Sequence, residues 1–161
     1  MADLSGFNAN EIQSIGGAMQ TDASKYGNRE DVEIQWAMKA YHHAETYFNL
    51  ISAVDPKLLK LTQLDDEIYK LFRESFSDFN VELLNEDEMK TPAAKEKWRQ
   101  FCNQFEKKVE DFNMGTLIRL DSKKEFSESN STIVVRIQFL AIEIARNREG
   151  YNDGLRKISK S

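Results

Sequence analysis

The stretch TIVVRIQFLAIEIARNREGYN, Thr132–Asn152, decides the expected fold of this chain. Its apolar residues recur at helical spacing and cover nearly every side of the helix. Asn130 or Ser131 can cap the beginning, and Gly150 can end the helix in a left-handed conformation. We therefore predict a helix over Thr132–Glu149. Its main apolar face holds Ile133, Ile137, Leu140, Ala141 and Ile144.

The end of this helix carries two arginines where apolar residues precede them. Arg148 continues the main apolar face one turn beyond Ile144, and Arg146 continues a second apolar face. An unpaired buried charge is very costly, so each arginine must reach solvent or meet an acid. The clearly polar stripe of the helix is narrow and holds Arg136, Glu143 and Asn147. The predicted acidic partners of the two arginines are Asp111, Glu110 and Asp121.

Two interpretations of this helix end remain open. In the structural one, it is a cation-rich C-terminus that Gly150 stops. In the functional one, it is a rim that recognises a partner, because Arg and Tyr are enriched in interface hot spots. The candidate partner-binding residues are Arg146, Arg148, Glu149, Tyr151, Asn152, Asp111 and Asn113.

The rest of the chain also shows helical periodicity. Asp55-Pro56 can stop one helix and start a short one over Pro56–Leu61. Thr116–Asp121 is compatible with a strand and can pair with Val81–Leu84. Three further long helices are predicted, over Asp31–Val54, Asp65–Phe79 and Pro92–Phe112. The expected buried face of the first holds Trp36, Ala37, Ala40, Tyr41, Ala44, Tyr47, Phe48 and Ile51.

These elements predict a mainly α fold. We expect a compact orthogonal bundle of four main helices plus short helices, with room for one minor two-stranded β element. A chain of 161 residues is long enough for one domain. We divide it into a flexible N-terminal arm (1–20), a single helical domain (21–153) and a short basic tail (154–161).

Charge and cysteine content narrow the class of partner. The net charge of −5 disfavours binding to nucleic acid, which needs a basic surface. The lone Cys102 cannot form an internal disulfide and favours a reducing compartment. No run of about 18 apolar residues is present, so we expect no membrane span. Other proteins or small molecules remain as partners.

We predict no catalytic, cofactor-binding or metal-binding residues. The adjacent His42 and His43 point about 100° apart on a helix and cannot chelate one ion together. The carboxylate runs at 65–67 and 86–88 fall at helix starts or loops, where capping or solvation explains them. Cys102 lies on a buried face, and no Gly-rich phosphate loop is present.

Four stretches of the chain together resemble one small eukaryotic family. They span about Tyr26 to Asn152 and read YGNREDVEIQWAMKAYHHAETYFNLISAVDPKLLKLT, DDEIYKLFRESF, AAKEKWRQFCNQFEKKVEDFNMGTLIRLD and RIQFLAIEIARNREGYN. They are similar to the polysaccharide biosynthesis domain-containing protein 1 family. The resemblance implies a mainly α orthogonal bundle in a cytoplasmic protein, or one that is both nuclear and cytoplasmic.

The resemblance also implies a function. Members of the family are assigned a chaperone role for translation elongation factor 1-alpha, on its GTP-binding domain during synthesis. We therefore expect a non-enzymatic, client-specific folding factor without cofactor that works as a monomer. The alternative is a small enzyme or accessory subunit in polysaccharide biosynthesis, related to methyltransferases. In it, Arg146 and Arg148 would hold an anionic group, and Asp111 or Asp121 would serve as base.

Overall fold

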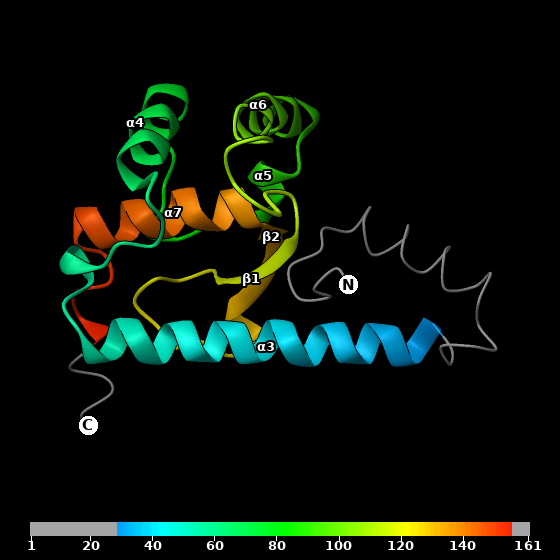
Figure 1. Cartoon of the computed structure of the whole chain (residues 1–161). Coiled ribbons are helices and arrows are strands. Elements are labelled where there is room, and N and C mark those ends of the chain that lie inside the picture. Colours follow the sequence, from blue (N-terminus) through cyan, green and yellow to red (C-terminus); the bar gives the residue numbers. More distant parts are fainter. Residues whose placement is uncertain (1–28, 156–161) are drawn as a thin grey trace.

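The computed structural model describes residues 29–155. The predicted arm (1–20), residues 21–28 and residues 156–161 lie outside this part of the chain. Within it, five α-helices and one two-stranded antiparallel sheet confirm the mainly α class with a minor β element (Figure 1). The helices are α3 (Arg29–Ala53), α4 (Asp65–Ser75), α5 (Glu86–Met89), α6 (Pro92–Asn103) and α7 (Arg136–Glu149). The strands are β1 (Gly115–Arg119) and β2 (Ser131–Val135), and short 3-10 helices span Pro56–Leu58 (η1) and Glu128–Asn130 (η2).

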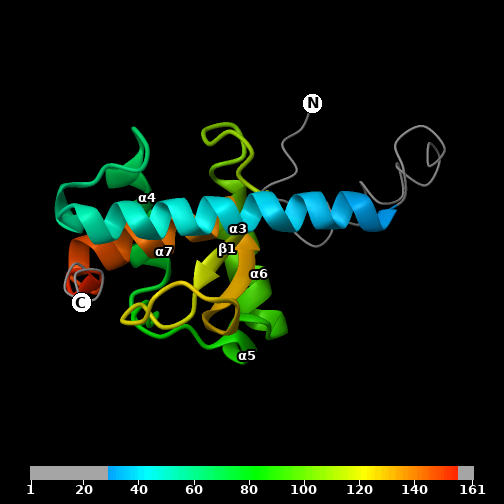
Figure 2. The ribbon, with the colours of Figure 1, turned by 90° about the horizontal axis from the view of Figure 1, so that it is seen from below.

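Helix α7 runs through the middle of the described structure. Helices α4 and α6 lie side by side on one side of it and cross it steeply, as in an orthogonal bundle (Figure 1). The sheet and the long helix α3 lie on its other side (Figures 1 and 2). In both views the first turns of α3 extend past the other described elements. Residues 141–147 of α7 are all buried. The burial of the apolar residues is as predicted, whereas Glu143 and Asn147 of the predicted polar stripe are also buried.

An aromatic cluster fills the space between α4 and α6. Phe72 is fully buried. Its ring centroid lies within 6.0 Å of the ring centroids of Phe76, Phe79, Trp98 and Phe101. The Phe76 and Trp98 rings stack with centroids 4.1 Å apart. Aromatic side chains bury large apolar areas, so this cluster is a main source of cohesion between the two helices.

Several predicted helix boundaries are confirmed. The Thr91 hydroxyl accepts a hydrogen bond from the Ala94 N–H at 3.2 Å, which caps α6 ahead of Pro92. The Asp55 carboxylate accepts one from the Lys57 N–H at 3.1 Å at the start of η1. Gly150 ends α7 with φ of 91°, a left-handed conformation that glycine adopts without strain.

The predicted start of the last helix is wrong. Residues 131–135 form β2, which pairs with β1 in the register Gly115↔Val135 to Arg119↔Ser131. Thr132, Ile133, Val134 and Val135 are all β-branched, and such side chains favour strands over helices. Helix α7 begins after them, where the Gln138 side chain accepts a hydrogen bond from the Val135 N–H at 2.9 Å.

The prediction that residues 116–121 form a two-stranded sheet with residues 81–84 is also wrong, because β1 pairs with β2 instead. Pairing between the two segments is present only as one isolated bridge between Leu83 and Asp121. Two backbone bonds flank this bridge, Leu84 N–H to Leu120 O and Ser122 N–H to Glu82 O, both 2.9 Å. The bridge fixes the segment after α4 beside the end of β1.

Three predicted helices end early. The short helix η1 stops at Leu58 instead of Leu61. Helix α4 stops at Ser75 instead of Phe79, and α6 stops at Asn103 instead of Phe112. The chain beyond Asn103 continues in tight turns, for example with Phe105 N–H bonded to Cys102 O at 3.0 Å. Such turns keep nearly the side-chain spacing of a helix, so Phe105 and Val109 are buried as the periodicity predicts.

The buried face of α3 is narrower than predicted. Ala40, Ala44 and Ile51 are buried, whereas Ala37 and Tyr41 are exposed. Ile34 and Met38 in the same turns are also exposed. Val32 in the first turn is buried as well, so a narrow stripe of α3 is covered even where the helix extends past the other described elements.

Candidate functional site

The first arginine of the predicted site, Arg146, is fully buried. Its Nη1 donates to Glu143 Oε2 at 2.6 Å, and its Nε donates to the Val81 carbonyl at 2.6 Å. Its Nη2 donates to the carbonyls of Arg119 and Leu120 at 2.9 and 3.1 Å. Arg146 therefore holds the Val81 segment and the end of β1 against α7, and no part of it faces solvent.

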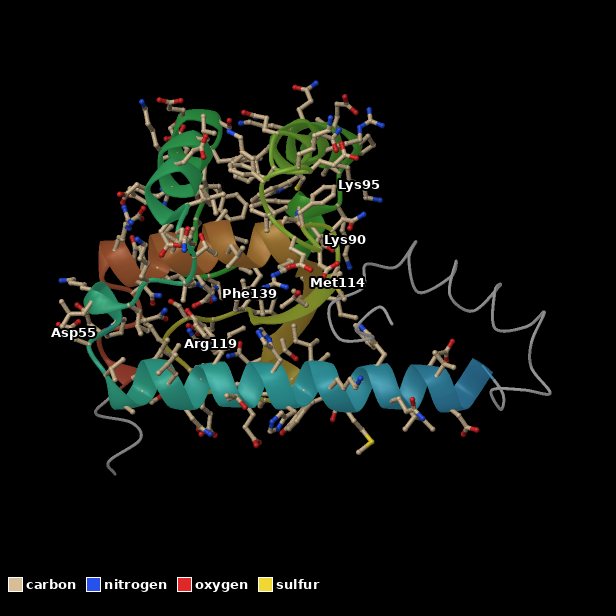
Figure 3. All side chains as sticks on the ribbon, in the orientation of Figure 1. Asp55, Lys90, Lys95, Met114, Arg119 and Phe139 are labelled. Atoms are coloured by element: carbon tan, nitrogen blue, oxygen red, sulfur yellow. The ribbon has the colours of Figure 1, made fainter. Side chains whose placement is uncertain are left out.

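A second buried arginine, Arg119 of β1, approaches the same glutamate. Its Nη2 lies 3.7 Å from Glu143 Oε1 and donates to Asn152 Oδ1 at 2.7 Å. Its Nη1 donates to the Ser122 carbonyl at 2.7 Å, and its Cζ lies 5.5 Å from the Phe48 ring centroid of α3. Burial lowers the pKa of Arg119, although an arginine stays charged. Figure 3 shows Arg119 between α3 and α7.

Glu143 is the centre of this buried network. Besides the arginines, the hydroxyl of Tyr47 and Nδ2 of Asn152 each donate to its Oε1 at 3.1 Å. Burial raises the pKa of Glu143, but the attraction of Arg146 and Arg119 and the hydrogen bonds outweigh it, so the net pKa is lowered. Burial and the neighbouring Glu143 raise the pKa of Tyr47 well above its usual value.

The buried network ties distant parts of the chain together. Tyr47 comes from α3, Arg119 from β1, Glu143 and Arg146 from α7, and Asn152 from the turn after α7. Asn152 also donates to Asn147 Oδ1 at 2.6 Å. Because both arginines and the glutamate find their partners inside the protein, the arrangement supports a structural role for Arg146 and Asn152.

Arg148 and Glu149 belong to a different cluster, at the surface between α4 and α7. Arg148 Nη2 lies 2.6 Å from Asp66 Oδ1, with side chains 37% and 94% exposed. Glu149 accepts hydrogen bonds from Nε and Nη2 of Arg73 at 2.8 and 2.6 Å and from the Tyr69 hydroxyl at 3.0 Å. The predicted partners Asp111, Glu110 and Asp121 are therefore wrong for both Arg146 and Arg148.

The remaining predicted site residues lie elsewhere or contribute little to either cluster. Asp111 is exposed with a positive φ of 54°, and Asn113 is half-buried. Between them, the Phe112 carbonyl accepts a hydrogen bond from the Ile137 N–H at the start of α7. This places Asp111 and Asn113 at the opposite end of α7 from the arginines. Tyr151 is half-buried against the core.

Sequence reasoning missed four members of the buried network. They are Tyr47, Arg119, Glu143 and Asn147. One signal was available, because Glu143 precedes Arg146 by three residues and such pairs meet on a helix. The contribution of Arg119 carried no such signal, since the network residues that it contacts, Glu143 and Asn152, are far away in the sequence.

A groove of about 920 Å³ lies between the end of α4, α5 and α6. We call it the α4–α6 groove. Its apolar lining includes Phe76, Phe79, Leu83, Leu84, Met89, Trp98 and Leu120. Leu83 is 53% exposed and so presents apolar surface within the groove.

Carboxylates outnumber cations along this groove. Asp78, Glu86, Asp87 and Glu88 line it together with Lys90 and Lys97. Glu86 lies 3.5 Å from Lys90, and Lys97 places its Nζ 4.6 Å from the Phe76 ring centroid. Within residues 29–155, no salt bridge involves Asp78, Asp87 or Glu88. The groove thus combines an apolar floor with an electronegative rim.

The described residues offer little for metal or thiol chemistry. No group of three or more His, Cys, Asp or Glu side chains among them is placed to hold a metal ion. Burial raises the pKa of the Cys102 thiol to about 12, which makes it a poor nucleophile. No helix in residues 29–155 is long and apolar enough to cross a membrane.

Comparison with known proteins shows which family the chain resembles. The sequence profile of the PBDC1 protein family matches residues 32–157. The chain belongs to this family. Protein PBDC1 of Homo sapiens is 53% identical over 142 residues, which cover 88% of this chain and 61% of the human protein. The PBDC1 homolog of Saccharomyces cerevisiae is 46% identical over 136 residues, which cover 82% of this chain and 93% of the yeast protein.

The fold is shared with a solved structure. A solution NMR structure of a Saccharomyces cerevisiae protein superposes with a TM-score of 0.73 at 44% identity. The superposition covers 86% of this chain and 98% of the yeast chain. This chain therefore shares its arrangement of helices and sheet with that yeast protein.

Proposed function

We propose that this PBDC1 family member is a non-enzymatic folding factor that binds translation elongation factor 1-alpha during synthesis, on its GTP-binding domain. The observation that carries the proposal is the α4–α6 groove, with its apolar floor and electronegative rim. An incompletely folded GTPase domain exposes apolar surface beside a basic nucleotide-binding region. A groove of this composition complements both features of such a client.

The charge of the groove suits a transient client. Complementary charge raises the rate of encounter more than it raises affinity, and a folding factor must release its client after folding. The net charge of −5 means that the chain as a whole also attracts a basic client. We infer that the protein works in the cytoplasm as a monomer, where translation supplies the client.

Two observations argue against the alternative, an enzyme or accessory subunit in polysaccharide biosynthesis. That alternative uses Arg146 and Arg148 to hold an anion, yet every nitrogen of the Arg146 guanidinium donates inside the protein, and Arg148 is paired with Asp66. It uses Asp111 or Asp121 as base. Asp111 lies at the other end of α7, and Asp121 is bridged to Leu83, where its side chain accepts a hydrogen bond from the Lys123 N–H at 2.9 Å.

A capture experiment in translating extract tests the proposal. The tagged full chain is added during synthesis of elongation factor 1-alpha, and bound protein is identified by mass spectrometry. We expect the elongation factor to be recovered, to be lost when translation is blocked, and to be recovered through its GTP-binding domain alone. Recovery of no elongation factor, together with tight binding of S-adenosylmethionine or a nucleotide sugar, would overturn it.

A further inference from the structure

We propose that the α4–α6 groove recognises a basic segment of its partner in which one large apolar side chain is flanked by lysines or arginines. This inference rests on the proposed function only for the name of the partner. The chemistry of the recognised segment follows from the residues that line the groove.

The apolar floor requires an apolar anchor. Trp98 and Phe76 form the stacked aromatic pair of the floor, and both are nearly fully buried. Leu83 stands beside them with 53% of its surface exposed. A volume of about 920 Å³ is that of a ligand pocket, and it exceeds what one large side chain fills. Burial of such an anchor against Leu83 removes apolar surface of both partners from water.

The rim requires positive charge beside that anchor. Asp78 lies in the turn after α4, whereas Asp87 and Glu88 lie in α5, so the carboxylates come from two separate lining segments. These three have no salt bridge among the described residues, while Glu86 is already paired with Lys90. Unpaired carboxylates next to apolar surface attract lysine or arginine and repel acidic segments and nucleic acid.

The protein itself contains an example of this recognition. Lys97 of α6 places its ammonium 4.6 Å from the centroid of the Phe76 ring, within the groove. A cation over an aromatic face is attracted by the ring electrons. Lys97 thus occupies a position that a lysine or arginine of the partner can take, and it also opposes a basic partner by its own charge. Its removal should therefore strengthen binding.

Peptide binding to the full chain tests the inference without any client. Three fluorescent peptides of about ten residues are compared by anisotropy. The first has a central Phe flanked by lysines, the second replaces this Phe with Ala, and the third replaces the lysines with glutamates. We expect the first to bind, the second to bind at least about tenfold more weakly, and the third not to bind. Affinity for the first should fall steadily from about 50 to about 500 mM salt.

Charge-matched variants locate the site. Asp87→Asn with Glu88→Gln should weaken binding of the first peptide about three- to tenfold. Glu106→Gln with Glu110→Gln removes the same charge from exposed positions outside the groove, and it should change the affinity less than twofold. Lys97→Ala should tighten binding about two- to fivefold. Each variant is first checked for an unchanged melting temperature.

The inference is refutable because the acid variants and Lys97→Ala are expected to change peptide affinity in opposite directions. Equal weakening by both double variants would mean general charge attraction, and weaker binding by Lys97→Ala would mean that the lysine itself contacts the ligand. Preference for the glutamate peptide would overturn the inference outright. If the peptides fail to bind while elongation factor 1-alpha is still captured from translating extract, the groove assignment falls, and the proposed function then rests on the capture result and not on the groove. If the peptides bind and the elongation factor is not captured, the groove assignment stands and the proposed function falls.

Discussion

Replacement of Glu143 by Gln is the sharpest test of the buried network. The carboxylate is enclosed and neutralises Arg146 at 2.6 Å and Arg119 at 3.7 Å. A glutamine of the same shape removes the negative charge and turns one acceptor into a donor that faces the guanidinium groups. Two buried arginines are then left with no carboxylate in contact.

The expected cost is large. Removal of one partner from a buried ion pair destabilises a protein by about 3–5 kcal/mol. For a chain of this length each kcal/mol lowers the melting temperature by about 2–4 °C, so we expect a decrease of about 6–20 °C. The same substitution at Glu149, which is partly exposed beside Arg73, serves as control on the same helix. It should cost about 1 kcal/mol.

The difference in stability between wild type and Glu143→Gln should also depend on pH. The folded protein holds the pKa of Glu143 below its ordinary value, so the ionised carboxylate stabilises the fold at pH values above that ordinary pKa. This contribution is lost as the pH falls through the lower pKa of the folded state. The gap between wild type and Glu143→Gln should therefore narrow on acidification. Chemical denaturation at pH 7 and at stepwise lower pH measures it. A gap at pH 7 no larger than that of Glu149→Gln would refute the reasoning.

Three further outcomes follow from the structure. Arg148→Ala removes a pair whose acid, Asp66, is almost fully exposed, so the melting temperature should fall by no more than a few degrees. A collapse of stability would show that Arg148 is an essential counter-ion. Cys102 should not react with a thiol reagent at pH 8 until the protein unfolds, because burial raises its pKa to about 12, and rapid native labelling would contradict this. Gly150→Ala should cost about 1–3 kcal/mol in chemical denaturation, because φ is 91° there, and an unchanged stability would argue against the left-handed end of α7.

Much of the helical framework could be predicted from the sequence, because apolar periodicity and capping residues are local signals. Asp55 and Gly150 act as predicted for this reason, and α6 begins at Pro92 as predicted. The start of α7 could not be separated from β2 in the same way. Residues 132–135 have apolar spacing that fits either structure, and the pairing with β1 decides between them.

The candidate site was harder to predict. Periodicity correctly indicates that Arg146 points into the core, but its partners are Glu143 and backbone carbonyls of residues distant in the sequence. The acidic run at residues 86–88 has a capping explanation, and Asn85 does cap α5. That these acids also border an aromatic groove depends on how α4 packs beside α6, which no local pattern encodes.

An assay of client folding tests most directly the central claim that this protein is a folding factor that acts through the α4–α6 groove. An extract that lacks this protein synthesises elongation factor 1-alpha, and the fraction of client that binds GTP and resists protease is followed over time. Wild type and the Glu106→Gln/Glu110→Gln control should restore this fraction, and Asp87→Asn/Glu88→Gln should restore it poorly. The account is contradicted if the client folds equally well without the protein, or if the groove variant performs as well as wild type.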